Sequence, residues 1–385
     1  MDEKLEKHVD KLIEENLKFN KKSLDAKRQA AKKLKRKVRS LKNLDAPDNV
    51  AIYGTDGGNN TFNFDAAGLK IVRVSDNNNN FEEIDIITDA DKRRDALDRK
   101  HLNSRGEPIK NPYTGKTTSI GKLMYEMGFS SIEEFTLITQ KRLEEGSSWL
   151  TDYRELMEWA VVYDFLDHEF LNDTVILREG QLRSKIFRGE YLIKIGEKMN
   201  EKIENQYKKR KKNIFLAAVA KSSSFIDMNR MALNEEGVMV IDKPACVYLP
   251  EDLEQKALNY GEWGMRINSW DGKGEHPKQN LSEAYLAKFG PRKYDKVYPV
   301  DIFYTQQSKA ERIISTIAKD SEGSYPIPSF PKSLQRAHDK SAITGLFKDE
   351  LNAKYMQGVR KYLGSEGFAI NKLLNVDYES RRYGS

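Results

Sequence analysis

The stretch VAIYGTDGGNN, residues 50–60, decides how the sequence is interpreted. An apolar run, 50–55, has the composition of a β-strand and leads into Asp56, two glycines and two asparagines. Gly and Asn are typical of tight turns, so we expect the strand to end at Asp56. The stretch therefore predicts a strand that delivers one carboxylate to the edge of a sheet. An ordinary turn that happens to carry an aspartate is the alternative interpretation.

The rest of the chain predicts three consecutive strands, followed by helices that alternate with strands. Strands are expected at 50–55, 68–75, 83–88, 173–180, 213–220 and 296–306, with a turn at DNNNN (76–80) and a hairpin at 237–249. Helices are expected at 3–43, 149–170, 189–212, 308–319, 333–344 and 348–364. This order predicts an α/β fold with a mixed sheet flanked by helices. It is also the element order of the ribonuclease H-like fold.

Two segments lie outside this alternation. Residues 1–46 predict a basic helical arm, which precedes a ribonuclease H-like domain over 47–385. Within that domain, residues 89–147 are polar, with a Gly- and Pro-rich centre and a short helix expected near 131–144. We interpret this segment as an insertion or cap.

The net charge of +6 is concentrated in the arm, because residues 1–45 hold 15 Lys and Arg against 8 Asp and Glu. The run 26–42 has nine basic residues and no acidic one, and its Ala, Leu, Lys and Arg favour helix. A basic helix suits a polyphosphate backbone or an acidic partner surface. A solvated or partly disordered tail is the alternative. The residues predicted to contact DNA are Lys32, Lys33, Lys35, Arg36, Lys37 and Arg39.

Composition predicts a soluble cytoplasmic protein that does not enter a membrane. The chain is 38% hydrophobic and 32% charged, and no run approaches the roughly 18 apolar residues that cross a bilayer. The N-terminus is charged, unlike a signal peptide. A single cysteine, Cys246, forms neither an internal disulfide nor a multi-cysteine zinc site, which agrees with a reducing compartment.

Three acidic residues fall where a ribonuclease H-like order brings side chains to one edge of the sheet. They are Asp56 after the first strand, Glu158 (or Glu155) on the first core helix, and Glu179 at the end of 173–180. Phosphodiester hydrolysis requires a deprotonated water and a stabilised leaving oxygen, and two divalent cations can provide both. Mn²⁺ and Mg²⁺ take oxygen ligands. Each acid alone also fits a turn, a helix flank or a strand end, but their coincidence indicates a metal site.

Several short motifs resemble successive signatures of the NurA nuclease family. They are YGTDGG (53–58), RELMEWA (154–160), VILREGQL (175–182), FLAAVAK (215–221), VDIFYTQ (300–306) and FPKSLQRAH (330–338). The resemblance extends from about residue 48 to 346. It implies a ribonuclease H-like fold and a Mn²⁺- or Mg²⁺-dependent DNA exo- or endonuclease. It also implies a homodimer that works with a hexameric HerA-like ATPase in DNA end processing or defence against phage.

The resemblance assigns roles to individual residues. The metal-binding aspartate of the family falls on Asp56, its helix glutamate on Glu158, its strand-end aspartate on Glu179 and its C-terminal histidine on His338. His338 could bind a metal, contact a phosphate or donate a proton. Independently of the resemblance, Lys221 directly follows FLAAVA and is expected at a strand end near the acids, where a cation can hold a scissile phosphate. A surface lysine and a helix-surface histidine are the alternative interpretations of these last two residues.

Two positions depart from the family. Glu179 replaces an aspartate and follows Arg178, which changes the expected ligand geometry. Phe330 stands where the family often has a tyrosine, and Tyr325 is close enough in sequence to replace it.

Two other classes of function remain open. Actin-like and sugar-kinase phosphotransferases also place an aspartate and glycines after a first strand, but the sequence has no duplicated domain and no GxxxxGK[ST] loop. A catalytically weakened DNA-binding or scaffold subunit is the third class, and the substitution at Glu179 is its main support.

Overall fold

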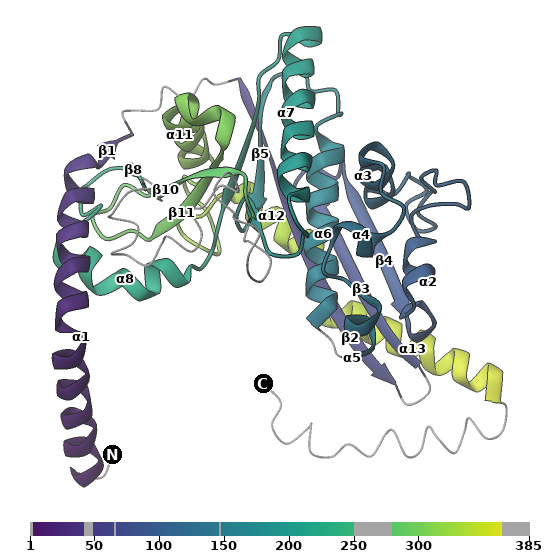
Figure 1. Cartoon of the computed structure of the whole chain (residues 1–385), viewed down its shortest axis with the longest axis horizontal. Helices are drawn as coiled ribbons and strands as arrows, with labels where there is room; N and C mark the ends of the chain where they lie inside the picture. The colour runs from purple at the N-terminus through teal and green to yellow at the C-terminus, as the bar shows by residue number, and fades with distance from the viewer. Residues whose placement is uncertain (1–2, 42–48, 65–66, 146–147, 250–278, 364–385) are drawn as a thin grey trace. The chain divides into compact units, whose positions relative to one another are not determined.

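The computed structural model describes residues 3–41, 49–64, 67–145, 148–249 and 279–363 (Figure 1). The chain divides into two compact units, Met1–Ser341 and Ala342–Ser385. In the second unit, helix α13 spans Gly345–Leu363. The first unit contains the sheet and the candidate site. Among the helices of these ranges, none combines the length and the apolar character that a membrane span requires.

A nine-stranded mixed sheet forms the centre of the first unit, in the order β1-β8-β10-β11-β7-β5-β2-β3-β4. Strands β2, β3 and β4 form an antiparallel meander, and β5 pairs parallel with both β2 and β7. The strands are β1 (Arg39–Ser40), β2 (Val50–Phe64), β3 (Ala67–Asp76), β4 (Glu82–Thr88), β5 (Asp173–Glu179), β7 (Ile214–Val219), β8 (Ala245–Tyr248), β10 (Ser282–Lys288) and β11 (Val297–Phe303). A separate two-stranded sheet pairs β6 (Arg183–Ser184) with β9 (Gln279–Asn280). The prediction of a mixed α/β sheet is confirmed.

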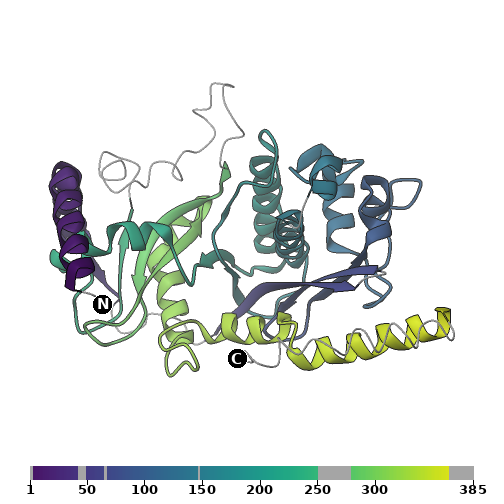
Figure 2. The ribbon, with the colours of Figure 1, turned by 90° about the horizontal axis from the view of Figure 1, so that it is seen from below.

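Helices cover both faces of this sheet. Figure 2 shows α6 and α7 on one side of β2 and β3, with α12 on the other side. Over the described residues of the first unit, the helices are α1 (Glu3–Lys37), α2 (Arg94–Asp98), α3 (Ser119–Met127), α4 (Ile132–Phe135), α5 (Gln140–Glu145), α6 (Ser148–Phe165), α7 (Tyr191–Arg210), α8 (Ser224–Glu235), α11 (Ala310–Asp320) and α12 (Lys332–Ser341), with 3-10 helices η1 (Asp89–Asp91) and η3 (Tyr304–Lys309).

The central strands are buried on both faces, because their side chains alternate between two apolar cores. Ile176 of β5 packs into the core formed with α6 and α7, whereas its neighbours Val175 and Leu177 pack into the core formed with α11 and α12. The residues of β7 alternate in the same way. Successive side chains along these strands therefore point alternately to the face covered by α6 and to the face covered by α12.

Strand β2 is longer than predicted and does not end at Asp56. Residues 55–64 pair antiparallel with β3, so the prediction that the stretch after Asp56 forms a turn is wrong. The cause is the partner strand, which supplies ladder hydrogen bonds to Gly and Asn residues that would otherwise favour a turn. The parallel pairing of β2 with β5 stops at Thr55 opposite Arg178. Asp56 thus lies one residue beyond the last β2 residue that pairs with β5.

The glycines of this strand allow close packing on its two faces. A Cβ on Gly54 would lie 2.6 Å from the backbone carbon of Ser333 on α12, and a Cβ on Gly57 would lie 2.5 Å from Oε1 of Glu158 on α6. Both separations are too short for real atoms. The glycines therefore let α12 and α6 approach the strand on either side of Asp56.

Other sequence expectations have mixed outcomes. The turn at 76–80 is confirmed. The hairpin at 237–249 is wrong, because only β8 is a strand there, and Val238 and Met239 are buried in irregular backbone against α8. Helix α8 and strand β10 are absent from the prediction, and the helix expected near 131–144 is divided into α4 and α5.

The two segments interpreted as accessory both contact the main unit. Ile120, Leu123 and Phe135 of the 89–147 segment are buried in the same core as α6. Ala31 and Leu34 near the end of α1 are buried against α8 and β8. The predicted helix to residue 43 ends at Lys37, and the predicted boundary at 46/47 lies outside the described residues, so the domain division stays a prediction.

The close approach of α12 to β2 can be tested with Gly54→Ala. The added Cβ must displace the backbone at Ser333, so we expect the free energy of unfolding to fall by about 1–3 kcal/mol in chemical denaturation. Gly358→Ala is the control, because no atom lies within 4 Å of a Cβ built there. An unchanged stability of Gly54→Ala would contradict the packing described for α12.

Candidate metal centre

A cavity of about 650 Å³ opens where β5 and β7 end, between residues of α6 and α12. It is lined by all five residues predicted to be catalytic: Asp56, Glu158, Glu179, Lys221 and His338. The chain separates these residues by up to 282 positions, so the fold assembles the group. Their placement in one cavity is observed, whereas their catalytic roles stay predictions.

Asp56 and His338 form the closest pair in this group. Nδ1 of His338 lies 2.7 Å from Oδ2 of Asp56, and the backbone N–H of Gly57 donates to Oδ1 of Asp56 at 2.8 Å. The hydrogen bond with Asp56 raises the pKa of His338 above its ordinary value, although partial burial opposes the shift. Helix α12 thus brings an imidazole directly to the carboxylate of β2.

Glu179 is the last residue of β5 and keeps one oxygen without a hydrogen bond. Its Oε1 lies 3.4 Å from Nζ of Lys221, whereas its buried Oε2 has no hydrogen-bond partner among the described residues. Burial raises the pKa of Glu179, and the charge of Asp56 raises it further, while Lys221 opposes both. A buried carboxylate oxygen that lacks a donor is a position where a cation would be stabilising.

Asp56, Glu179 and His338 can offer one ligand atom each to a shared ion. The three ligand atoms lie within 4.8 Å of one another, and this is the one such group of His, Cys, Asp and Glu found in the described ranges. Two carboxylates and one imidazole suit a divalent cation. The orphaned Oε2 of Glu179 is consistent with this use, so the residues fit a metal.

The alternation of side chains along each strand explains why Asp56 and Glu179 point to the same face of the sheet, the face covered by α12. Gly54 faces α12, so Asp56, two residues later, shares that face. Glu179 is two residues after Leu177, which packs with α12. If the β2–β5 register continued one step beyond Thr55 and Arg178, Asp56 and Glu179 would be partners.

Glu158 lies on the opposite face and is held by two arginines. Its Oε2 lies 2.7 Å from Nη2 of Arg178, and its Oε1 lies 3.3 Å from Nε of Arg154 one helical turn earlier. Burial raises the pKa of Glu158 to about 7, although both guanidinium groups favour the ionised form. Glu158 lines the cavity but is not a member of the group that can share an ion.

Arg178 is fixed by three kinds of contact. It pairs with Glu158, donates from Nη1 to the carbonyl of Gln181 at 2.6 Å, and lies 4.9 Å from the ring centroid of Trp159. The sequence indicated Arg178 only as a difference from the NurA motif that the segment resembles. The spacing Arg154-x-x-x-Glu158 would have predicted an i, i+4 ion pair on α6, but nothing local indicated that Arg178 joins it.

Lys221 follows β7 and reaches the carboxylates. Its Nζ lies 3.4 Å from Glu179 and 5.6 Å from the ring centroid of Phe330. Phe330 is fully buried, whereas Tyr325, the proposed replacement for the family's tyrosine, is 87% exposed and is not among the residues that line the cavity. The described structure therefore gives no support to Tyr325 as a site residue.

The predicted DNA contacts of the arm lie elsewhere, on the last turns of α1 and on β1. All six side chains are exposed. Lys32 and Arg39 meet acidic groups of the same chain, since Lys32 lies 3.8 Å from Glu236 and Arg39 lies 2.6 Å from Glu311. These pairs reduce the local positive charge that the sequence indicated. A DNA-binding role of the arm stays a prediction.

No model of a protein family matches the sequence, and no curated protein matches it. Among solved structures, the NurA nuclease from Sulfolobus solfataricus is similar over 95% of this chain and 99% of its own, with 12% identity and a TM-score of 0.41. A structure of NurA with manganese is similar over 89% of this chain and 96% of its own, with 11% identity and a TM-score of 0.38. A further NurA structure covers 89% and 94%, with 12% identity and a TM-score of 0.35.

Mn²⁺ binding tests whether Asp56, Glu179 and His338 form one ligand group. Asp56→Asn and Glu179→Gln are each expected to weaken Mn²⁺ binding about 10-fold or more in calorimetry, because each removes a charged ligand. Glu158→Gln is expected to change the affinity by less than about 3-fold, because its carboxylate already pairs with two arginines.

The matched control for this measurement is Glu201→Gln, an exposed carboxylate of α7. Circular dichroism of each variant establishes that it is folded. An equal loss of affinity in Glu158→Gln and Glu179→Gln would show that Glu158 is a ligand and that the three-residue group is wrong.

Proposed function

We propose that this protein is a divalent-metal-dependent deoxyribonuclease that hydrolyses phosphodiester bonds. The observation that carries the proposal is the convergence of Asp56, Glu179 and His338 beside Lys221 in an open cavity. This combination places groups that can hold a divalent cation next to one that can hold a phosphate.

The topology supports the same function. The strand order β4-β3-β2-β5-β7, a meander followed by two parallel strands, supports our proposal of a ribonuclease H-like core. Asp56 and Glu179 lie on the first and fourth strands of that proposed core. Three of the sequence motifs that resemble the NurA family, YGTDGG, VILREGQL and FLAAVAK, fall on β2, β5 and β7.

The donor set favours Mn²⁺ or Mg²⁺ as the metal. Carboxylates suit both ions, and the imidazole of His338 favours Mn²⁺ of the two. When bound, such a cation would act as a Lewis acid that activates water and polarises the phosphodiester. Asp56, Glu179 and His338 would hold it. If two ions are bound, as the sequence predicted, Glu158 would have to give up an ion pair with one of its two arginines and bind the second ion instead.

The cations of the cavity would bind the substrate. Lys221 lies close enough to Glu179 that a phosphate oxygen near that carboxylate also meets the ammonium group. Arg154 lines the cavity and donates to Oδ1 of Asn59 at 3.2 Å, which orients its guanidinium. Both groups stabilise negative charge that increases at phosphorus during hydrolysis. Glu158 is then a positioning residue that fixes Arg154 and Arg178.

The finer biological role follows from the sequence resemblance. We include in the proposal a homodimer, a hexameric HerA-like ATPase as motor, DNA contacts from the basic arm, and a role in DNA end processing or phage defence. The first half of α1 exposes Leu5, Leu12, Ile13 and Leu17 at helical spacing, which gives a second copy an apolar surface to cover. Light scattering that gives only the 44.4 kDa monomer at all concentrations would contradict the dimer.

Nuclease activity is tested with purified protein and end-labelled linear and circular DNA, in Mn²⁺, Mg²⁺ or EDTA. We expect cleavage with the metals and none in EDTA. Asp56→Asn is expected to reduce the rate at least about 100-fold, because it removes a metal ligand. Glu201→Gln is the control and is expected to cleave at the wild-type rate.

Other outcomes identify the alternative functions. Cleavage that persists in EDTA would defeat the metal-dependent mechanism. DNA binding without cleavage in any metal would favour the scaffold subunit. Binding of ATP by the isolated protein would favour a kinase-like phosphotransferase.

A further inference from the structure

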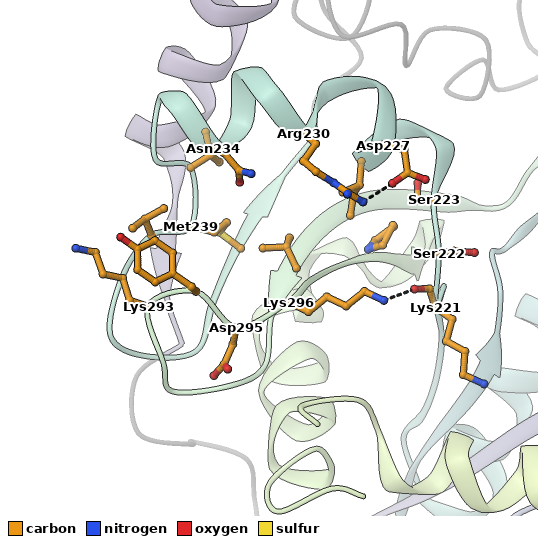
Figure 3. A pocket seen from close by; sticks show the side chains of 16 residues that line it. Lys221, Ser222, Ser223, Asp227, Arg230, Asn234, Met239, Lys293, Asp295 and Lys296 are labelled. Atoms are coloured by element: carbon orange, nitrogen blue, oxygen red, sulfur yellow. Dashed lines mark hydrogen bonds and ion pairs between the residues drawn. The ribbon is translucent and has the colours of Figure 1, made fainter. Parts of the chain in front are cut away.

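A second cavity, of about 580 Å³, adjoins the candidate metal centre (Figure 3). Its walls come from residues 221–223 after β7, from α8 and the segment 238–240, and from residues 293–297 before and within β11. We propose that this cavity is a binding subsite for a single DNA strand that extends from the metal centre. The inference rests on the proposed nuclease function and specifies where its substrate continues.

The two cavities share three consecutive residues, Lys221, Ser222 and Ser223. Figure 3 shows the side chain of Lys221 directed away from the second cavity, while its carbonyl oxygen accepts a hydrogen bond from Nζ of Lys296 at 2.8 Å. The ammonium group of Lys221 lies instead beside Glu179 in the first cavity. Since consecutive Cα atoms are about 3.8 Å apart, Ser223 lies within about 8 Å of Lys221. A bound strand can therefore pass from one cavity to the other within a few nucleotides.

The rim of the second cavity has an excess of positive charge. Arg230, Lys293 and Lys296 are exposed cations, against the carboxylates of Asp227 and Asp295. Asp227 pairs with Arg230 at 2.5 Å, and Asp295 accepts a hydrogen bond at 2.7 Å from the backbone N–H three residues earlier. Lys296 uses one of its three N–H donors for the carbonyl of the β7–α8 connection. A phosphate backbone would therefore meet available N–H donors from Lys296 and a net positive rim.

The remaining surface suits a nucleobase. Val238 and Met239 are buried and supply an apolar floor. Tyr294 is 81% exposed and lies at the edge beside Lys293, whose Nζ is 5.6 Å from the centroid of the ring. Exposed aromatic rings stack with bases, and nearby cations hold the backbone of a single strand. A cavity of this volume accommodates a small-molecule-sized group, so one strand enters it and a duplex does not.

Fluorescence anisotropy with labelled oligo-dT of 4, 8 and 12 nucleotides tests the subsite in EDTA, where no metal-dependent cleavage occurs. The variant Lys293→Gln with Lys296→Gln is expected to bind the 12-nucleotide strand about 10-fold more weakly. The negative slope of log K against log salt is expected to become shallower by about 1.4, because two phosphate contacts are lost. Tyr294→Ala is expected to weaken binding about 5-fold or more, because one stacked base is lost.

The matched control removes two exposed lysines of the 89–147 segment, Lys110→Gln with Lys141→Gln, which line neither cavity. It is expected to bind like the wild type. The subsite is wrong if the Lys293 and Lys296 variant binds as the wild type does, or if the control loses as much affinity. Tighter binding of oligo-U than of oligo-dT would overturn the assignment to DNA.

A parallel assay separates this inference from the proposed function. Wild-type hydrolysis of bis(p-nitrophenyl) phosphate with Mn²⁺ tests the metal centre alone, because this small diester does not need a strand-binding subsite. Hydrolysis together with unaltered oligonucleotide binding in the variants would refute the subsite and leave the nuclease. Weakened binding in the variants without any hydrolysis would support the subsite and refute the nuclease.

Discussion

The pairing register between β2 and β5 is the constraint on which the site depends. The parallel ladder stops at Thr55 and Arg178, so Asp56 and Glu179 occupy the next step, where no ladder bond holds the strands together. Both side chains point to the face covered by α12, because residues two apart on a strand share a face. Helix α12 packs against Gly54 on that face and brings His338 to within 2.7 Å of Asp56. A shift of one residue in this register would move a carboxylate to the opposite face.

The same alternation divides the charges of the cavity into two groups. On the α12 side, two carboxylates and an imidazole converge, and one carboxylate oxygen lacks a hydrogen-bond partner among the described residues. On the α6 side, Glu158 is balanced by Arg154 and Arg178, which lie within 3.3 Å of its oxygens. Buried carboxylates of like charge repel one another, and the charge of Asp56 acts on Glu158. The two arginines therefore lower the cost of placing Glu158 near Asp56. This division favours one cation at the α12 side over a pair that bridges both faces.

Sequence patterns predicted the elements better than their contacts. The order of strands and helices, the turn at 76–80 and the acidic residues of the cavity were accessible, because hydrophobic periodicity and turn composition are local signals. The length of β2 could not be predicted, because pairing with β3 at ten positions overrides the turn preference of Gly57 to Asn60. Helix α8 was not predicted, because its apolar residues pack against α1, which lies about 200 residues earlier in the chain. The pairing of Glu158 with Arg178 depends on strand register and helix packing together, which no single segment encodes.

We propose that Asp56, Glu179 and His338 together hold one divalent cation. Anomalous diffraction from crystals of the protein soaked in Mn²⁺ would show this ion and its ligands. We expect one strong anomalous peak in contact with a carboxylate oxygen of Asp56, Oε2 of Glu179 and a ring nitrogen of His338, with Glu158 still paired to Arg178. A cavity without a peak, or a peak bound to Glu158 with Arg178 displaced, would contradict it.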